Sequence, residues 1–322
     1  MCADDLETVA DSLGGDIVVA GPSEGPGAVE TLAGGDGQLR VVGVGDTEAL
    51  GDAVRDAGAV VVAMDGPSSL SASVRQAADA EDGFVVAVLD GQEDESLEPA
   101  RLGRVREGAD VTLLACRGHR PEGSPSGRSD AAETQFGRAG SGAAVGGAFE
   151  FARMLDTPGQ INLDLADART VLTDGALAVL AGGTASFETE SPGRAVQRAF
   201  EGIPPSVDVT GGSGALVSVA GGPEMSIDDA VAAVRTVRRE LGPTENLIWG
   251  VAVEEALADQ LTVDIVVDDV HPPLSAGDSC RRCGAALAAY TFGDRTTLAC
   301  EACGFADLSV SLGDWSDHDA GN

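Results

Sequence analysis

Five short runs of apolar residues, most of them rich in valine, lie in the first 115 residues of the chain. Each run is soon followed by glycine, and the segments 48–57 and 70–80 between them have helical spacing. Apolar runs without polar alternation are typical of strands buried on both faces of a parallel sheet. The pattern therefore predicts a doubly wound α/β domain. The predicted strands are Ile17–Ala20, Arg40–Val44, Ala59–Met64, Phe84–Leu89 and Val111–Ala115.

The charge balance is strongly acidic, with 53 acidic side chains against 20 basic ones and a formal net charge of −33. All the basic residues are arginine. Such a chain repels itself in dilute buffer, but at molar salt the Debye length falls to about 3 Å and the repulsion is screened. We interpret the acidity as the solvation chemistry of a halophilic protein and not as a sign of basic partners. It argues against nonspecific binding to nucleic acid or to membrane surfaces.

No apolar run reaches the roughly 18 residues that a membrane span needs. The first five residues, Met1–Asp5, are acidic, unlike the basic start of a signal peptide. Residues 1–15 are expected to form an acidic N-terminal arm. We expect the protein to remain in the cytoplasm.

The segment 158–172 carries the most distinctive polar pattern. Pro158 and Gly159 extend a helix poorly and are expected to end the preceding one. Asn162 or Asp164 can cap the next helix, with Asp167 in its first turn. Helix capping accounts for one acid, but the spacing of all three polar residues is harder to explain by capping alone.

Asn162, Asp164 and Asp167, followed by Arg169-Thr170-Val171, resemble the synergy loop of the FtsZ/tubulin superfamily. In that family the loop of one subunit reaches the nucleotide of the subunit below, and its acids position the water that attacks the γ-phosphate. The resemblance covers roughly residues 15–270. It implies catalytic roles for Asn162, Asp164 and Asp167 on a neighbouring subunit.

The resemblance also implies the division of the chain. Residues 16–157 are expected to form a Rossmann-like, degenerate GTPase-type domain that includes a long central helix at about 143–155. Residues 158–270 are expected to form a second α/β domain that begins with the synergy loop. A capping box at Ser226–Asp229 opens one helix of this domain, with Ile227, Ala230, Val234, Val237 and Leu241 on its apolar face. The other elements predicted there are strands at 177–185, 214–220, 246–253 and 261–267 and a helix at 192–200.

The first phosphate loop of the family follows the first predicted strand, where this chain keeps Gly21, Gly25 and Gly27. Pro22 and Pro26 have no N–H to offer a phosphate. The carboxylate of Glu24 at ~4 Å from a phosphate would cost about 4 kcal/mol per charge pair at an effective dielectric near 20. A tight strand-to-helix turn is the alternative interpretation of this segment.

The glycine-rich signature of the family follows the third predicted strand, and here only Gly66 remains. Ser68 and Ser69 could hold an anion at a helix N-terminus, or they could cap that helix. The segment 136–142 lacks the acid or amide with which the family reads guanine. Together these changes predict that binding of GTP or GDP is lost.

Four cysteines form two Cys-x-x-Cys-Gly pairs after a linker at His271–Pro273. Two such pairs at this separation predict a closed, tetrahedral, structural zinc site in a ribbon at residues 277–312. A pair of redox disulfides is the alternative. An acidic tail, residues 313–322, follows. The predicted zinc ligands are Cys280, Cys283, Cys300 and Cys303.

The leading hypothesis is a non-hydrolysing partner or regulator of a cytoskeletal filament that caps FtsZ filaments through its synergy-loop face. One alternative is an active GTP-binding GTPase with atypical phosphate loops. Another is a zinc-ribbon adaptor on an FtsZ-like scaffold. The implied partners are FtsZ-like subunits or other cell-division proteins.

Overall fold

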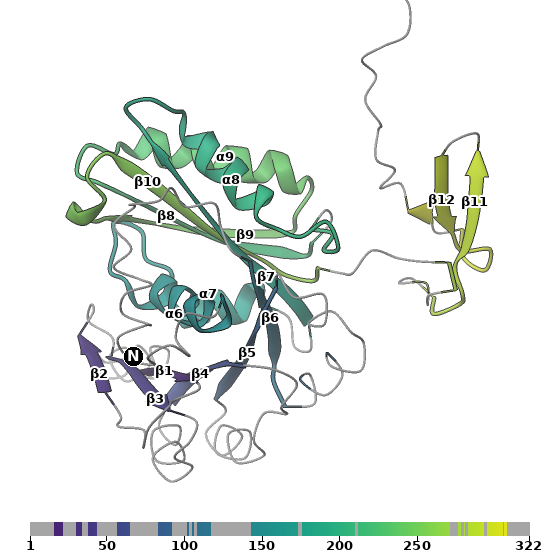
Figure 1. Ribbon diagram of the computed structural model, residues 1–322, viewed down its shortest axis with the longest axis horizontal. Coiled ribbons are helices and arrows are strands. Elements are labelled where there is room, and N and C mark those ends of the chain that lie inside the picture. The colour runs from purple at the N-terminus through teal and green to yellow at the C-terminus, as the bar shows by residue number, and fades with distance from the viewer. Residues whose placement is uncertain are drawn as a thin grey trace, which may run out of the picture. The chain divides into compact units, whose positions relative to one another are not determined.

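The computed structural model separates into two compact units, residues 1–270 and 271–322, which we call the body and the ribbon (Figure 1). The predicted arm and tail lie outside the described residues. The structure describes residues 16–21, 30–33, 38–43, 57–64, 83–91, 102, 105, 108–116, 143–172, 176–209, 212–270, 276–277, 280, 283–292, 295–304 and 306–307.

A ten-stranded sheet forms the centre of the body, with the strand order β2-β3-β1-β4-β5-β6-β7-β10-β8-β9. The strands from β3 to β7 in this order pair in parallel, which confirms the predicted parallel sheet. At one edge of the sheet, β2 pairs antiparallel with β3, and this strand was not predicted from the sequence. The strands are β1 Asp16–Gly21, β2 Glu30–Ala33, β3 Gln38–Gly43, β4 Ala57–Ala63, β5 Phe84–Asp90, β6 Val111–Ala115, β7 Ala176–Ser186, β8 Gly214–Gly221, β9 Asn246–Val253 and β10 Gln260–Val267.

The second half of the body continues the same sheet, because β7 pairs in parallel with β6. Strand β10 lies antiparallel between β7 and β8, and β9 closes the edge in parallel with β8. All four predicted strands of this half are present. One sheet thus crosses the predicted domain boundary at residue 157, and the division into two domains stays a prediction. The predicted helix at 70–80, and residues 48–56 of the other, lie outside the described residues.

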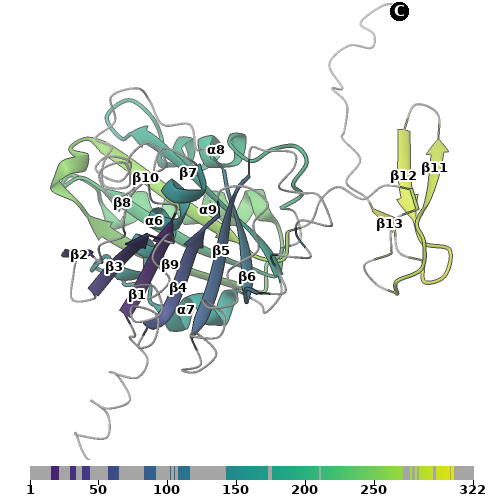
Figure 2. The ribbon, with the colours of Figure 1, turned by 60° about the horizontal axis from the view of Figure 1, so that its bottom comes forward.

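In the part of the chain that the structure describes, α6 and α7 cover one face of the sheet and α8 and α9 cover the other (Figures 1 and 2). Alternate residues of the buried strands belong to two separate cores, one under each pair of helices. Helix α6 packs on β1, β4, β5 and β6, whereas α7 packs on β8 and β9. The helices are α6 Ala143–Asp156, α7 Leu165–Val171, α8 Pro192–Glu201 and α9 Ile227–Leu241.

The long central helix predicted at 143–155 is α6, and it ends at Asp156, just before Pro158 and Gly159. Its side chains Phe149 and Phe151 are fully buried against the sheet. A Cβ added at Gly147 would lie 2.3 Å from the Cβ of Ala115 in β6, so this glycine allows the helix to approach the strand closely.

The predicted capping box of α9 is confirmed. The backbone N–H of Asp229 donates to the Ser226 hydroxyl at 3.2 Å, and the Ser226 N–H donates to the Asp229 carboxylate at 2.9 Å. The predicted apolar face is buried at Ala230, Val234, Val237 and Leu241. Ile227 differs from that prediction: it is 49% exposed, because it stands at the first helical position, ahead of the turns that pack on the sheet.

A bidentate ion pair joins helix α8 to the turn that follows β7. Arg198 donates from both terminal nitrogens to the carboxylate of Glu190, at 2.9 and 2.8 Å, and also to the Thr184 carbonyl at 2.6 Å. These hydrogen bonds from the Arg198 guanidinium hold the pKa of the Glu190 carboxyl below its ordinary value of 4.5. A carboxylate whose pKa is lowered by folding stabilises the protein above its unfolded pKa. That contribution is lost as the pH falls through the folded pKa.

We therefore expect Glu190→Gln to lower the free energy of unfolding at pH 7, and the deficit to shrink below about pH 4.5. The measurement is denaturant unfolding of both proteins across that range. Glu201→Gln is the matched control, because its pair with Arg194 is more exposed (37% and 55%) than that of Arg198 with Glu190 (16% and 29%). A Glu190→Gln deficit that stays constant down to pH 3 would contradict the expectation.

The ribbon contains a three-stranded antiparallel sheet in the order β11-β12-β13. Its buried core is very small, because among the described residues it consists of Cys280, Leu287 and Cys300, with Ala285 and Cys303 packed against them. Apolar burial on this scale cannot by itself hold a module of this size folded. The strands are β11 Ala288–Phe292, β12 Arg295–Ala299 and β13 Ala306–Asp307.

Candidate functional site

The loop between α6 and α7, residues 157–164, is bonded through its backbone to the edge of the sheet. Gln160 N–H donates to the Val251 carbonyl at 2.7 Å, and Val251 N–H donates to the Ile161 carbonyl at 2.8 Å. These bonds form an isolated antiparallel bridge between Ile161 and β9. A Cβ at Gly159 would lie 2.2 Å from the Val251 oxygen, so this close approach requires glycine. Strand β9 therefore sets the position of the loop.

Each of the three polar residues predicted for catalysis has a local backbone partner. The Asn162 side-chain oxygen accepts from Gly159 N–H at 2.7 Å. Asp164 is the N-cap of α7 and accepts from Asp167 N–H at 2.9 Å, while the Asp167 carboxylate accepts from Asp164 N–H at 3.1 Å. This reciprocal capping box accounts for both acids. The expectation that capping explains only one of them was wrong.

The same residues remain accessible to a neighbouring molecule. Asn162 and Asp164 are exposed and Asp167 is half-buried, whereas the intervening Leu163 and Leu165 are buried and anchor the segment. Each carboxylate uses one oxygen in the capping box. The second oxygen of each acid takes no part in the capping box.

Helix α7 is also tied to the first half of the body. A terminal nitrogen of Arg169 donates to the Gly58 carbonyl at 3.0 Å, at the start of β4. The Arg169 guanidinium lies 5.8 Å from the centroid of the Phe84 ring, at the start of β5, which is within cation–π range. The loop before the acids is thus bonded to β9, and the helix that they begin contacts β4 and β5 through Arg169.

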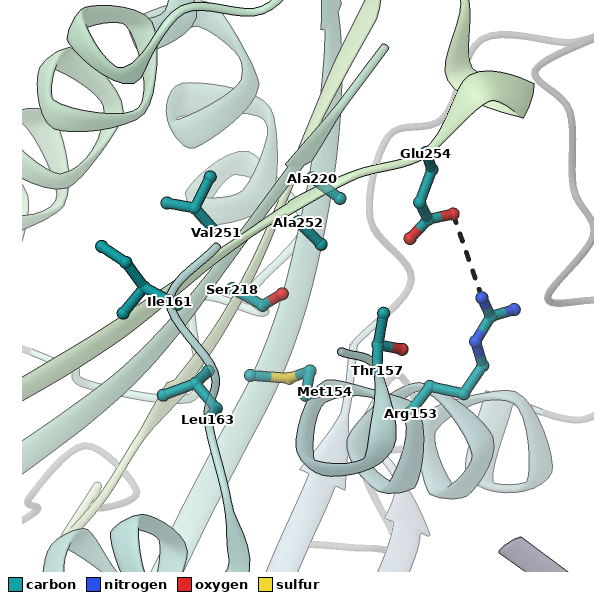
Figure 3. Close-up of a pocket in the computed structure, with 11 residues that line it drawn as sticks. Arg153, Met154, Thr157, Ile161, Leu163, Ser218, Ala220, Val251, Ala252 and Glu254 are labelled. Atoms are coloured by element: carbon teal, nitrogen blue, oxygen red, sulfur yellow. Dashed lines mark ion pairs between the residues drawn. The ribbon is translucent and has the colours of Figure 1, made fainter. Parts of the chain in front are cut away.

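A small pocket lies between the C-terminal end of α6, the loop and strands β8 and β9 (Figure 3). Arg153 on α6 and Glu254 after β9 form an ion pair of 3.9 Å beside it. The pocket has room for about one water molecule. The pocket is lined by Arg153, Met154, Thr157, Ile161, Leu163, Ser218, Ala220, Gly250, Val251, Ala252 and Glu254.

The predicted phosphate loops are barely covered by the structure. Gly21 is the last residue of β1 and is buried. The other candidates, Gly25, Gly27, Gly66, Ser68 and Ser69, lie outside the described residues, as does the segment 136–142. The prediction that these loops are degenerate continues to rest on the sequence.

The four predicted zinc ligands lie together in the ribbon. Their sulfur atoms are all within 4.8 Å of one another, with 3.6 Å between Cys280 and Cys303 and 3.4 Å between Cys283 and Cys300. Four thiolates around one Zn²⁺, with bonds of about 2.3 Å, place the sulfurs about 3.8 Å apart. The described geometry therefore fits a metal ion held by four cysteines.

Both Cys-x-x-Cys pairs have the same local backbone structure. Gly284 N–H donates to the Cys280 carbonyl at 2.8 Å, and Gly304 N–H donates to the Cys300 carbonyl at 2.9 Å. The two glycines have φ of 76° and 72°, a left-handed conformation that other residues adopt only with strain. The glycine after each pair thus permits the turn that brings its two thiols to one centre.

Cys116 is unlike the ribbon cysteines. It is buried at the end of β6, and burial, with a smaller contribution from the negative charge of Asp90, raises the pKa of its thiol to about 12. It stays protonated and unreactive at neutral pH. Cys2 lies outside the described residues.

Sequence reasoning missed three sets of contacts in the loop region: the bridge to Val251, the two contacts of Arg169, and the ion pair of Arg153 with Glu254. Each joins segments that are far apart in the chain, so no local spacing reveals them.

Within the described residues, no helix is long and apolar enough to cross a membrane.

Residues 176–271 match a family model described as FtsZ family, C-terminal domain. Cell division protein FtsZ 1 of Archaeoglobus fulgidus is 34% identical over 124 residues, which cover 38% of this chain and 33% of that protein. FtsZ 1 of Halobacterium salinarum is 33% identical over 120 residues, covering 37% and 30%. The chain thus matches about one third of the length of these curated relatives.

Among solved structures, a mutant FtsZ of M. jannaschii is similar to this chain with a TM-score of 0.56. The identity is 18%, and the alignment covers 82% of this chain and 94% of that one. At this identity the likeness concerns the fold. The match to the family model lies in the second half of the body, whereas the shared fold extends through most of the chain.

Proposed function

The chain is a protein of the FtsZ/tubulin superfamily with an FtsZ C-terminal domain at residues 176–271, and we propose that it acts as a non-hydrolysing partner of an FtsZ-like filament. It caps one end of the filament through its synergy-loop face, which comprises Asn162, Asp164 and Asp167. The proposal concerns the whole protein, of which only part resembles the curated relatives.

The observation that carries this proposal is the presentation of the loop acids. Asp164 and Asp167 are fixed by reciprocal backbone bonds, and each keeps one carboxylate oxygen outside them. The backbone bridge to β9 fixes the loop that precedes them. Such pre-organisation supports a group that acts on a neighbour, because no ordering is needed when the contact forms. The fixed acids could complete a nucleotide site on the subunit below.

The other half of such a contact is missing from the sequence. Pro22, Glu24 and Pro26 stand in the first phosphate loop, and Asp65 and Pro67 stand in the second. Proline offers no N–H to a phosphate, and carboxylates repel it. A subunit with intact loop acids and no nucleotide can complete the nucleotide site of one neighbouring subunit. It has no nucleotide of its own for the loop acids of the next subunit to contact. Growth would stop at that end.

Added to an FtsZ of a halophile with GTP in molar KCl, the protein is expected to shorten filaments at substoichiometric ratios. The variant Asp164→Asn with Asp167→Asn keeps an acceptor oxygen at each cap position but removes both charges, and we expect it to alter GTP hydrolysis by the partner at the end contact. Filament length by electron microscopy and phosphate release are the measurements.

The matched control is Asp228→Asn with Asp229→Asn, which removes the same charge from the first turn of α9. It should behave like the unmodified protein. Filament length and GTP turnover that do not change at any ratio would show that the capping proposal is wrong.

The chain alone is expected to show no saturable GTP binding at submillimolar concentration and no turnover. Three parts of the family's nucleotide site depart from the pattern independently, and compensation for all three is not expected. Calorimetry in molar KCl measures the binding. Clear saturation, or hydrolysis that Asp164→Ala abolishes, would favour the alternative that the protein is an active GTPase whose Ser68 and Ser69 hold phosphate.

We further propose that Cys280, Cys283, Cys300 and Cys303 bind one structural Zn²⁺. Four thiolates form a closed site with no open position for substrate, so the metal would organise the ribbon. This supports a second candidate function, a zinc-ribbon adaptor for which the body is a scaffold. Pull-down of a cytoskeletal partner with the full chain and with residues 1–270 separates the two, because only the adaptor requires the ribbon.

A further inference from the structure

The four cysteines of the cluster differ in how far they are exposed. Cys283 is exposed and Cys303 is half-buried, whereas Cys280 and Cys300 are only 3% and 1% exposed. A closed structural site does not need an exposed cysteine. The exposed Cys283 is the thiolate that a dissolved oxidant meets first.

We propose that Cys283 is an oxidation site, at which a peroxide forms a disulfide between Cys283 and Cys300 and thereby releases the metal. The proposal rests on the zinc site proposed above. Cys300 is the second partner because its sulfur lies 3.4 Å from that of Cys283, slightly closer than the 3.6 Å between the sulfurs of Cys280 and Cys303. The reaction needs little movement, since both sulfurs already face the same centre.

The chemistry balances with hydrogen peroxide as the oxidant. The Cys283 thiolate attacks one peroxide oxygen, the O–O bond breaks, and the departing hydroxide takes up a proton to leave as water. The resulting sulfenic acid is attacked by the Cys300 thiolate, the S–O bond breaks, and the second hydroxide is protonated to water. Two electrons pass from the two sulfurs to the peroxide. The metal loses two of its four anionic ligands.

A second equivalent of peroxide can join the remaining pair, because the sulfurs of Cys280 and Cys303 lie 3.6 Å apart. Both disulfides connect the two Cys-x-x-Cys pairs and neither lies within one pair. Oxidation at Cys283 therefore predicts an ordered linkage pattern across the ribbon. The buried thiol of Cys116 lies outside the cluster and should remain unmodified.

The experiment uses the full chain with Cys2→Ser in molar KCl. Zinc content is measured first by elemental analysis, and substoichiometric hydrogen peroxide is then added in the presence of a chromogenic zinc chelator. Free thiols are alkylated and the disulfides are mapped by mass spectrometry. The sequence suits this mapping, because trypsin cleaves after Arg282 and Arg295, and an enzyme specific for glutamate cleaves after Glu301, between Cys300 and Cys303.

The expected result is that the first disulfide joins Cys283 to Cys300 and that one zinc is released for each such disulfide. Cys116→Ser should leave both values unchanged. A first disulfide within one pair, a first disulfide between Cys280 and Cys303, or zinc retained after Cys283 is oxidised would overturn the proposal. Zinc absent before the oxidant is added would instead refute the zinc site, and the linkage order would still be read from the same sample.

Discussion

Removal of the metal from the four-cysteine cluster should unfold the ribbon and leave the body folded. The reason is the size of the ribbon's core, which among the described residues contains Cys280, Leu287 and Cys300. Structural Zn²⁺ contributes on the order of 10–16 kcal/mol of apparent binding free energy in modules of this kind at neutral pH. Because an unfolded chain has no preformed site, that binding energy is folding energy.

The measurement is amide hydrogen exchange before and after a strong chelator is added in molar KCl. Protection should disappear from β11 and β12 and persist in β4 to β8. Cys280→Ser should have the same effect without chelator, and Cys116→Ser should have none. Protein that was prepared without chelator and contains no zinc, yet keeps protected ribbon amides, would contradict both the metal site and this prediction.

Replacement of Gly183 by alanine should destabilise the body by about 3 kcal/mol, the upper end of the usual cost of overpacking. Gly183 lies in β7, where a Cβ would approach the Ala195 carbonyl oxygen to 2.1 Å and the Ala199 nitrogen to 2.6 Å. Both atoms belong to the backbone of α8, so no side-chain rotation relieves the clash. The helix itself would have to move off the sheet, although Ala195 and Ala199 are fully buried there.

Gly146→Ala is the matched control, because a Cβ at this position in α6 would meet nothing within 4 Å. Alanine favours a helix over glycine by about 0.5–1 kcal/mol, so this variant should be slightly stabilised. Denaturant unfolding of the two variants gives the comparison. Equal midpoints would mean that α8 can shift at little cost and that the close packing is not required.

The architecture of the body was largely predictable, because it follows from local patterns. Strands buried on both faces read as continuous apolar runs, and the capping box at Ser226 marks the start of α9 to the residue. The edge strand β2 was not predictable from its sequence. Glu30–Ala33 has neither a long apolar run nor clear alternation, and it becomes a strand by pairing with β3.

In the candidate sites too, local features were predictable and contacts between distant segments were not. Cysteine spacing predicted which four sulfurs come together, because the turn after each pair is encoded locally by Gly284 and Gly304. The contacts that hold the loop and α7 could not be predicted from the sequence, since Val251 lies 90 residues from Ile161 and Gly58 lies 111 residues from Arg169. Spacing also suggested that capping explains only one of the two acids, whereas the reciprocal bonds of the capping box use both Asp164 and Asp167.

The bridge between the loop and β9 has a consequence for how this chain can change over evolutionary time. The bonds to Val251 come from backbone atoms of Gln160 and Ile161, so substitutions other than proline at these two positions leave the bridge in place. Gly159 has no such freedom, because any side chain would collide with the Val251 carbonyl. Homologous chains should therefore vary at 160 and 161 and keep glycine at 159. The positions of the acids would then be kept while the sequence just before them changes.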